Sequence, residues 1–258
     1  MSSRRKFVAN SFWFISGAGL FSRIATTSAS ESMTPASPLY EEEDLLKIKE
    51  LLANKSPLKW VFCGDSITQG AKHTLGYRSY PEIFGERVRW ELGRVRDFVI
   101  NTAISGNTSR DVLNDFDWRV GQFKPSVVSL MIGTNDVSKK KEISVTEFKK
   151  NNQALIEKIR QGGAIPILQT PNIIITEKAN GRERIAEYIS VTREIAAERK
   201  VILVDHFSHW QNFSRQDEIV TKWLNDELHP NGKGHIMMAH LLFRKLSIFD
   251  SNAFTCRE

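Results

Sequence analysis

Residues 60–70 read WVFCGDSITQG, a short run of apolar and β-branched residues followed at once by Gly64, Asp65 and Ser66. An apolar run of this length that ends in a glycine is typical of a strand buried on both faces. The acidic and hydroxyl residues after it predict a turn at the carboxyl end of that strand. Such a turn can serve chain geometry alone, or it can hold a serine hydroxyl toward a substrate, so the rest of the chain has to decide.

Four further segments have the same strand-like character, and helical patterns separate them. The expected strands are LKWVFC, FVINTAI, VVSLMI, IPILQT and VILVD. The expected helices cover residues 41–55, 80–92, 110–120, 145–160, 182–199 and 233–245. This alternation predicts an α/β fold of three layers, in which a five-stranded parallel sheet lies between helices. Such sheets bind ligands at the carboxyl ends of their strands, which is where Ser66 falls.

The N-terminal segment has the pattern of an export signal. It begins with SSRRKF, continues with an apolar stretch from Phe7 to about Phe21 and ends in small residues. That stretch is shorter than the ~20 residues needed to span a bilayer, and the paired arginines resemble a twin-arginine signal. We therefore predict a signal at residues 1–30, a Pro/Ser-rich linker at 31–40 and a single domain at 41–258. The domain is expected in the periplasm or outside the cell, without stable membrane insertion once the signal is removed. An ordinary secretory signal or an uncleaved anchor is the alternative.

The net charge of +6 does not indicate a nucleic-acid partner. Residues 1–30 contain four basic residues and no acid, so they carry four of the six charges. The remainder is spread over helices of mixed sign, whereas nucleic-acid binding needs a clustered basic surface. The expected partner is instead a small-molecule or carbohydrate ester, and the sequence makes no prediction of oligomeric state.

No pattern in the sequence indicates a metal or a cofactor. Cys63 and Cys256 lack the spacing of a zinc site and are too few for a disulfide framework, so we predict two free thiols. His235 and His240 share a predicted helix, but five residues of separation place them about 140° apart around it. There is no glycine-rich phosphate loop of either common type. We therefore predict neither a metal nor a cofactor.

Polar residues near later strand ends supply what a serine nucleophile needs. The segment NDELHPNGKG contains Asp226 and His229. A serine hydroxyl is a weak nucleophile until a base takes its proton, and histidine is the side chain best suited to that task near neutral pH, which makes His229 the candidate base. Asp226 lies three residues before His229, a spacing that lets its carboxylate hold the imidazole in the required tautomer. We predict Ser66, His229 and Asp226 as the catalytic residues.

Acyl transfer also needs hydrogen-bond donors around the negative oxygen that develops on the substrate. The candidates are the backbone N–H groups of Ser66 and Gly106 and the side-chain amide of Asn135, all of which follow predicted strands. Glycine at position 106 allows close approach of the backbone to a substrate. Asp65 and Asp136 are expected to hold the site loops through hydrogen bonds to backbone N–H groups.

Four sequence blocks together resemble the SGNH hydrolases, also called the GDSL-type esterase and lipase family. The blocks are GDSITQG, NTAISGNTS, IGTND and DELHPNGKGH, and they occur in the order of that family between residues 61 and 235. The resemblance implies an SGNH/flavodoxin-like fold and a carboxylic ester hydrolase whose nucleophile, base pair and oxyanion donors are the residues predicted above. One departure is Ala103, where the family often has glycine, and we expect this difference to alter packing rather than chemistry.

The resulting hypothesis is an exported serine esterase that hydrolyses a small acyl ester, an acetyl ester above all, through an acyl-serine intermediate. A carbohydrate substrate is suggested only weakly, because aromatic residues on helices belong to the core more often than to a sugar site. The aromatic candidates are Tyr77, Tyr80, Trp118, Trp210 and Trp223. A lysophospholipase or thioesterase is an alternative that would need an apolar lid, for which residues 173–175 are the nearest candidate. A non-catalytic carbohydrate-binding protein of the same fold is another, although no catalytic residue is missing.

Overall fold

The computed structural model describes residues 39–214 and 221–257, which belong to one compact unit. The predicted export signal lies outside the described residues. Helix α1 begins at Leu39, so it includes the last two residues of the stretch predicted as a linker. Among the described helices, none is both long enough and apolar enough to cross a membrane.

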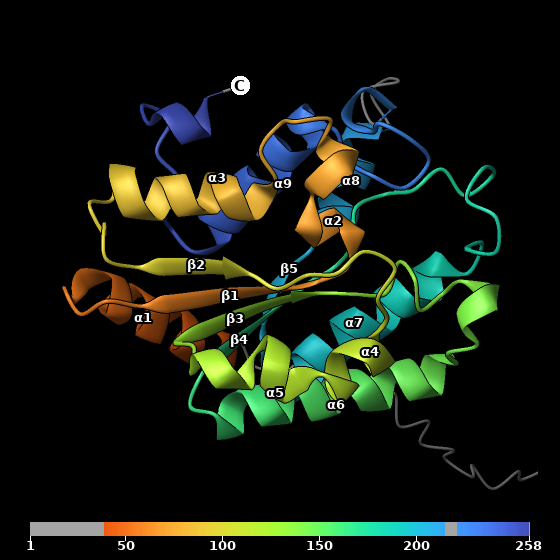
Figure 1. The fold of residues 1–258 in the computed structure, drawn as a ribbon, viewed down its shortest axis with the longest axis horizontal. Coiled ribbons are helices and arrows are strands. Elements are labelled where there is room, and N and C mark those ends of the chain that lie inside the picture. Colours follow the sequence, from red (N-terminus) through yellow and green to blue (C-terminus); the bar gives the residue numbers. More distant parts are fainter. Residues whose placement is uncertain (1–38, 215–220, 258) are drawn as a thin grey trace, which may run out of the picture. The chain divides into compact units, whose positions relative to one another are not determined.

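Five parallel strands form the sheet in the order β2-β1-β3-β4-β5, which confirms the predicted fold class (Figure 1). The strands are β1 (Lys59–Gly64), β2 (Phe98–Asn101), β3 (Val127–Met131), β4 (Ile165–Gln169) and β5 (Ile202–Val204). Val61 of β1 pairs with Ile100 of β2 on one side and with Val128 of β3 on the other. The chain therefore changes its direction of progress across the sheet at β1, and open α/β sheets bind ligands at such switch points.

Helices cover both faces of the sheet, with α3 and α9 on one face and α4 to α7 on the other (Figure 1). The longer helices are α1 (Leu39–Ala53), α3 (Tyr80–Glu86), α6 (Val145–Gln161), α7 (Ile185–Arg199), α8 (His206–Ser214) and α9 (Gly232–Lys245). The short ones are α2 (Ser66–Gln69), η1 (Ala71–Thr74), η2 (Arg87–Glu91, a π-helix), α4 (Ser109–Asn114), α5 (Phe116–Arg119), η3 (Gly121–Phe123), η4 (Lys139–Lys141), η5 (Thr221–Trp223) and η6 (Phe254–Cys256).

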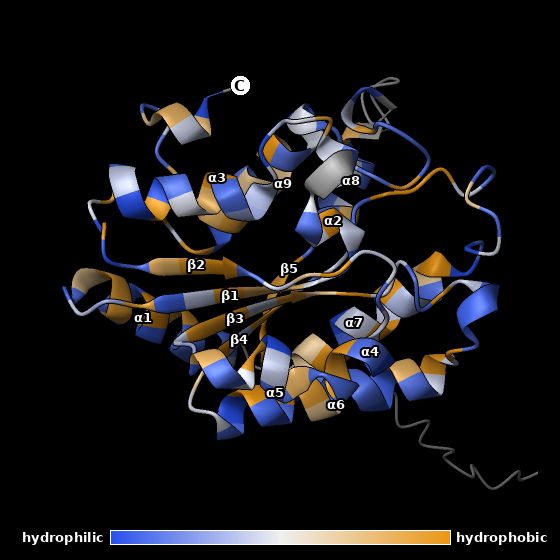
Figure 2. Cartoon of the chain, viewed as in Figure 1, coloured by the Kyte–Doolittle hydropathy of each residue, from blue (hydrophilic) through white to orange (hydrophobic). Residues whose placement is uncertain are grey.

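Alternate residues of β1 pack into the two cores. Trp60 and Phe62 belong to the cluster that includes α3 and α9, whereas Val61 and Cys63 belong to the cluster that includes α4 to α7. Figure 2 shows hydrophobic residues along much of the sheet, and hydrophobic and hydrophilic residues alternating on the helices that flank it. A strand buried on both faces needs apolar residues at every position, which explains the uninterrupted apolar run in the sequence.

Two helical regions differ from the sequence prediction. The helix predicted over residues 110–120 is divided into α4 and α5, because Asp115 leaves the helical conformation with φ −100° and ψ 17°. Helix α8 is not predicted by the sequence, since HFSHWQNFS is rich in residues of modest helix propensity. Both cysteines are buried and free, which confirms the prediction of two thiols.

Candidate active site

The nucleophile candidate lies at the tight junction between β1 and α2. The Asp65 carboxylate caps α2 by accepting a hydrogen bond from the Ile67 N–H at 3.0 Å. A Cβ atom on Gly64 would lie 2.4 Å from the Met131 carbonyl oxygen, so only glycine fits at the end of the strand. These constraints hold Ser66 at the carboxyl edge of the sheet, beside the switch point.

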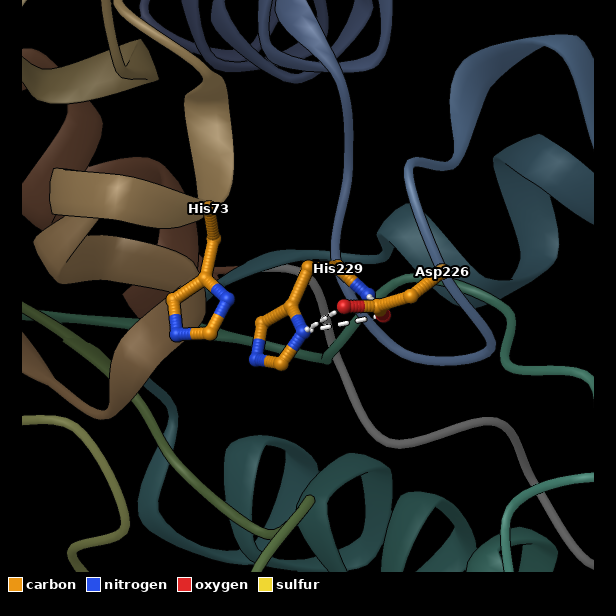
Figure 3. Close-up of side chains that lie close together, drawn as sticks. All are labelled: His73, Asp226 and His229. Carbon is orange, nitrogen blue, oxygen red and sulfur yellow. Dashed lines mark hydrogen bonds and ion pairs between the residues drawn. The ribbon is translucent and has the colours of Figure 1, made fainter.

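The loop before α9 brings His229 and Asp226 to Ser66. His229 Nε2 lies 2.9 Å from Ser66 Oγ, and His229 Nδ1 lies 2.7 Å and 2.9 Å from the two carboxylate oxygens of Asp226 (Figure 3). The Asn225 N–H donates to the His229 carbonyl at 2.8 Å and closes this loop. When the Nδ1 proton is donated to the carboxylate, Nε2 can accept the serine proton. This is the geometry of a Ser-His-Asp triad.

Local hydrogen bonds keep the Asp226 carboxylate charged. Partial burial alone would raise the pKa of Asp226, but the backbone N–H groups of Leu228 and His229 and the His229 ring all donate to the carboxylate. These bonds outweigh the desolvation and hold the pKa of Asp226 below its usual value. A charged carboxylate favours the tautomer of His229 that carries its proton on Nδ1.

The two remaining predicted residues lie on neighbouring loops. The Asn135 amide nitrogen donates to the Asn107 carbonyl at 3.1 Å, and its oxygen accepts from Arg182 at 3.3 Å. The bond to Asn107 joins the loop after β3 to the loop that carries Gly106. The amide nitrogen has two hydrogens, so one N–H remains for a ligand. Gly106 has φ +80°, and nothing lies within 4 Å of the point where a side chain would begin.

The buried guanidinium of Arg119 joins the loops of the site, a role that sequence reasoning missed. It donates to the Gly64 carbonyl at 2.9 Å, to the Thr102 carbonyl at 3.1 Å and to Asn107 Oδ1 at 2.7 Å. Arg119 therefore ties the nucleophile turn to the loop that carries Gly106. One feature of the sequence indicates that Arg119 is buried. It follows the apolar Phe116 by three residues, so both lie on the helix face directed at the sheet.

Two buried acids support the same loops, as the sequence predicts. Asp136 Oδ1 accepts from the Ser109 N–H at 2.8 Å, which fixes the start of α4. Burial raises the pKa of Asp65 to about 7 and that of Asp136 to about 6, and the nearby carboxylate of Asp136 raises the pKa of Asp65 further. Hydrogen bonds from backbone N–H groups oppose these shifts without cancelling them.

A second histidine, also missed by the sequence reasoning, stacks on His229. The two rings of His73 and His229 lie 3.6 Å apart at an angle of 13° (Figure 3). Ligand atoms of His73, Asp226 and His229 lie within 4.8 Å of one another, which is close enough for a shared metal ion. Imidazole binds a metal in the plane of its ring, so one of these parallel rings would have to turn before both could hold the same ion.

The hydrogen-bonded Ser-His-Asp series at the carboxyl edge of this sheet defines a hydrolase of the SGNH fold. The family described as GDSL-like Lipase/Acylhydrolase matches residues 62–236. The chain belongs to this family and is a carboxylic ester hydrolase.

Known relatives include esterases that act on acetylated carbohydrate. The acetylxylan esterase of Geobacillus stearothermophilus is 30% identical over 209 residues, which cover 73% of this chain and 93% of that enzyme. The solved structure of a catalytic mutant of an acetylxylan esterase from the same organism has a TM-score of 0.64 and 26% identity, and the match covers 75% of this chain and 96% of that one. An uncharacterized protein of Mycoplasma pneumoniae is 32% identical over 120 residues, which are 45% of this chain but only 14% of that protein.

Proposed function

We propose that this chain is a serine esterase that removes small acyl groups, acetyl above all, from carbohydrate. The observation that carries the proposal is the unbroken series of hydrogen bonds from Asp226 through His229 to Ser66. Similarity to acetylxylan esterases supports the choice of substrate. We also propose that the protein is exported, on the basis of residues 1–30, which lie outside the described structure.

In this mechanism the Ser66 hydroxyl attacks the ester carbonyl while His229 Nε2 takes its proton. The N–H groups of Ser66 and Gly106 and the free N–H of Asn135 stabilise the tetrahedral oxyanion. His229 then gives the proton to the departing alcohol, which leaves an acyl-serine. Water, deprotonated by the same imidazole, attacks the acyl-serine and releases the acid.

The structure offers little support for a lid over long acyl chains. Ile174 is buried, and Ile173 and Ile175 are partly buried and packed against the core, so these side chains do not form an exposed apolar flap. Their segment instead supports the loop at residues 224–231, which carries Asp226 and His229 and is called the base loop below. The Asn172 amide donates to the Leu228 carbonyl at 3.1 Å, and the Ile175 N–H donates to the Glu227 carbonyl at 2.9 Å. This arrangement favours a small acyl group over a lysophospholipid or a long-chain thioester.

A panel of p-nitrophenyl esters tests the proposed acyl specificity. We expect kcat/KM to be highest for the acetate and to fall progressively from butyrate to octanoate, because no described apolar lid covers a longer chain. Acetylated xylotetraose should release acetate in the same preparation. A preference for octanoate would contradict the small-acyl assignment, and absence of turnover on every ester would favour a carbohydrate-binding protein.

Asn135→Ala tests the proposed oxyanion donor. We expect kcat to fall by about 10²- to 10³-fold with a small change in KM, because the lost donor acts mainly in the transition state. The comparison variant Asn135→Asp keeps an acceptor for Arg182 but places negative charge near the oxyanion, so it should lose at least as much activity. An Asn135→Ala enzyme of normal kcat would remove this residue from the mechanism.

A further inference from the structure

A pocket of about 480 Å³ lies beside the base loop and has no part in the mechanism above. This volume is within the ~300–1,000 Å³ range of small-molecule sites. The residues that line the pocket are Tyr77, Asn225, Asn231, Gly232, Lys233, Ile236 and Met237. They come from the loop after η1, from the base loop and from the first turns of α9.

Tyr77 provides an aromatic surface that the backbone holds in place. A Cβ atom on Gly232 would lie 2.7 Å from Cγ of the Tyr77 ring, so the ring packs directly against a residue that has no side chain. Tyr77 is nevertheless 70% exposed as a residue. The ring is therefore packed on one face and open to solvent on the other. Such a ring is available to stack on the flat, weakly apolar C–H face of a sugar, which a buried core ring is not.

Polar groups at the rim can bind hydroxyl groups. The side chain of Lys233 is exposed and forms no hydrogen bond or ion pair with the other described residues. Asn225 donates its amide to the His73 carbonyl, which leaves its oxygen as an acceptor at the pocket. Asn231 has a different task, because its oxygen caps α9 by accepting from the N–H groups of Lys233 and Gly234 at 3.0 Å.

The pocket shares a wall with the triad. Asn225 directly precedes Asp226, its N–H donates to the His229 carbonyl at 2.8 Å, and its side chain holds the His73 backbone. His73 in turn stacks on the His229 ring. A substrate whose ester lies at Ser66 and whose alcohol part extends along the side of the base loop formed by Asn225 and His73 would approach this pocket.

We propose that this pocket is a subsite for the sugar chain attached to the acetylated unit, with Tyr77 as the stacking platform. The inference rests on the proposed function, since it assigns the alcohol part of that same substrate. A carbohydrate fits the combination of one exposed ring, an ammonium group without a partner among the described residues, and an amide oxygen. Ile236 and Met237 also give the pocket apolar walls, so a long acyl chain is the competing occupant, which esters of increasing chain length distinguish from a sugar.

Two substrates that differ only in the alcohol test the subsite. Tyr77→Ala is expected to lower kcat/KM for acetylated xylotetraose by about tenfold, the scale of one aromatic contact, mainly through KM. Its activity on p-nitrophenyl acetate should stay close to that of the parent enzyme, because the aryl acetate is too short to need the pocket. Tyr77→Phe should keep the oligosaccharide activity, and Gly232→Ala should lose it because the added methyl displaces the ring. Trp118→Ala is the matched control, since Trp118 is 67% exposed but lies outside the pocket.

Binding provides a readout that does not depend on turnover. In the Ser66→Ala background, calorimetry with unacetylated xylotetraose should detect binding that Tyr77→Ala weakens by about tenfold. Equal losses on both substrates, or a loss confined to long-chain p-nitrophenyl esters, would overturn the sugar subsite. Failure of the parent enzyme to cleave any acetyl ester would instead overturn the proposed function, so the two failures are distinguishable.

Discussion

Replacing Ser66 with alanine is expected to lower kcat for p-nitrophenyl acetate by about 10⁵- to 10⁶-fold, as removal of the nucleophile does in other serine hydrolases. The variant loses the oxygen proposed to form the acyl-enzyme, whereas the proposed oxyanion donors stay in place. The fold should be retained, because the Ser66 hydroxyl makes one hydrogen bond within the described part of the chain, to His229, and loss of a typical hydrogen bond costs only about 1 kcal/mol.

Covalent labelling separates loss of the nucleophile from loss of the fold. A fluorophosphonate should modify the parent chain at Ser66, and Ser66→Ala should not be labelled although its thermal unfolding is unchanged. Ser105→Ala is the matched control, since Ser105 is an exposed serine near the site that has no part in the mechanism. Labelling that persists undiminished in Ser66→Ala would overturn the assignment of the nucleophile.

The features that sequence predicts well are those that local pattern and topology determine. The apolar run of β1 predicts a strand buried on both faces, and parallel strands necessarily bring their carboxyl ends to one edge. That reasoning places the loops after β1, β2 and β3 together, as the structure does. The contact between Asp226 and His229 is also local, because three residues of a turn span it.

Contacts between distant segments are not predictable in the same way. Arg119 binds Gly64 from 55 residues away, and the stacking of His73 on His229 depends on how two loops pack. Burial of aromatic residues has the same origin. Tyr80 and Trp210 are fully buried, whereas Tyr77 is exposed, and this difference depends on helices far away in the sequence.

Replacing Asp226 with asparagine should lower kcat by about 10³- to 10⁴-fold, through the tautomer of His229. The asparagine oxygen can still accept from the N–H groups of Leu228 and His229, so the loop should keep its conformation. The new NH₂ group would donate to Nδ1 and leave the imidazole proton on Nε2. That nitrogen could then no longer take the proton of Ser66. Because the Asp226 side chain is 41% exposed, water can replace part of its effect, which favours the lower end of the range.

The adjacent acid provides the control for charge. Glu227→Gln removes the same negative charge one residue further along the loop, and Glu227 contributes its carbonyl, not its side chain, to the hydrogen bond with Ile175. Its kcat should therefore remain close to that of the parent enzyme. If Glu227→Gln lost as much activity as Asp226→Asn, the loop would act through its overall charge. If Asp226→Asn kept normal kcat, the carboxylate would have no role in orienting His229. Only a large loss confined to Asp226→Asn is consistent with a proton held on Nδ1 by this carboxylate.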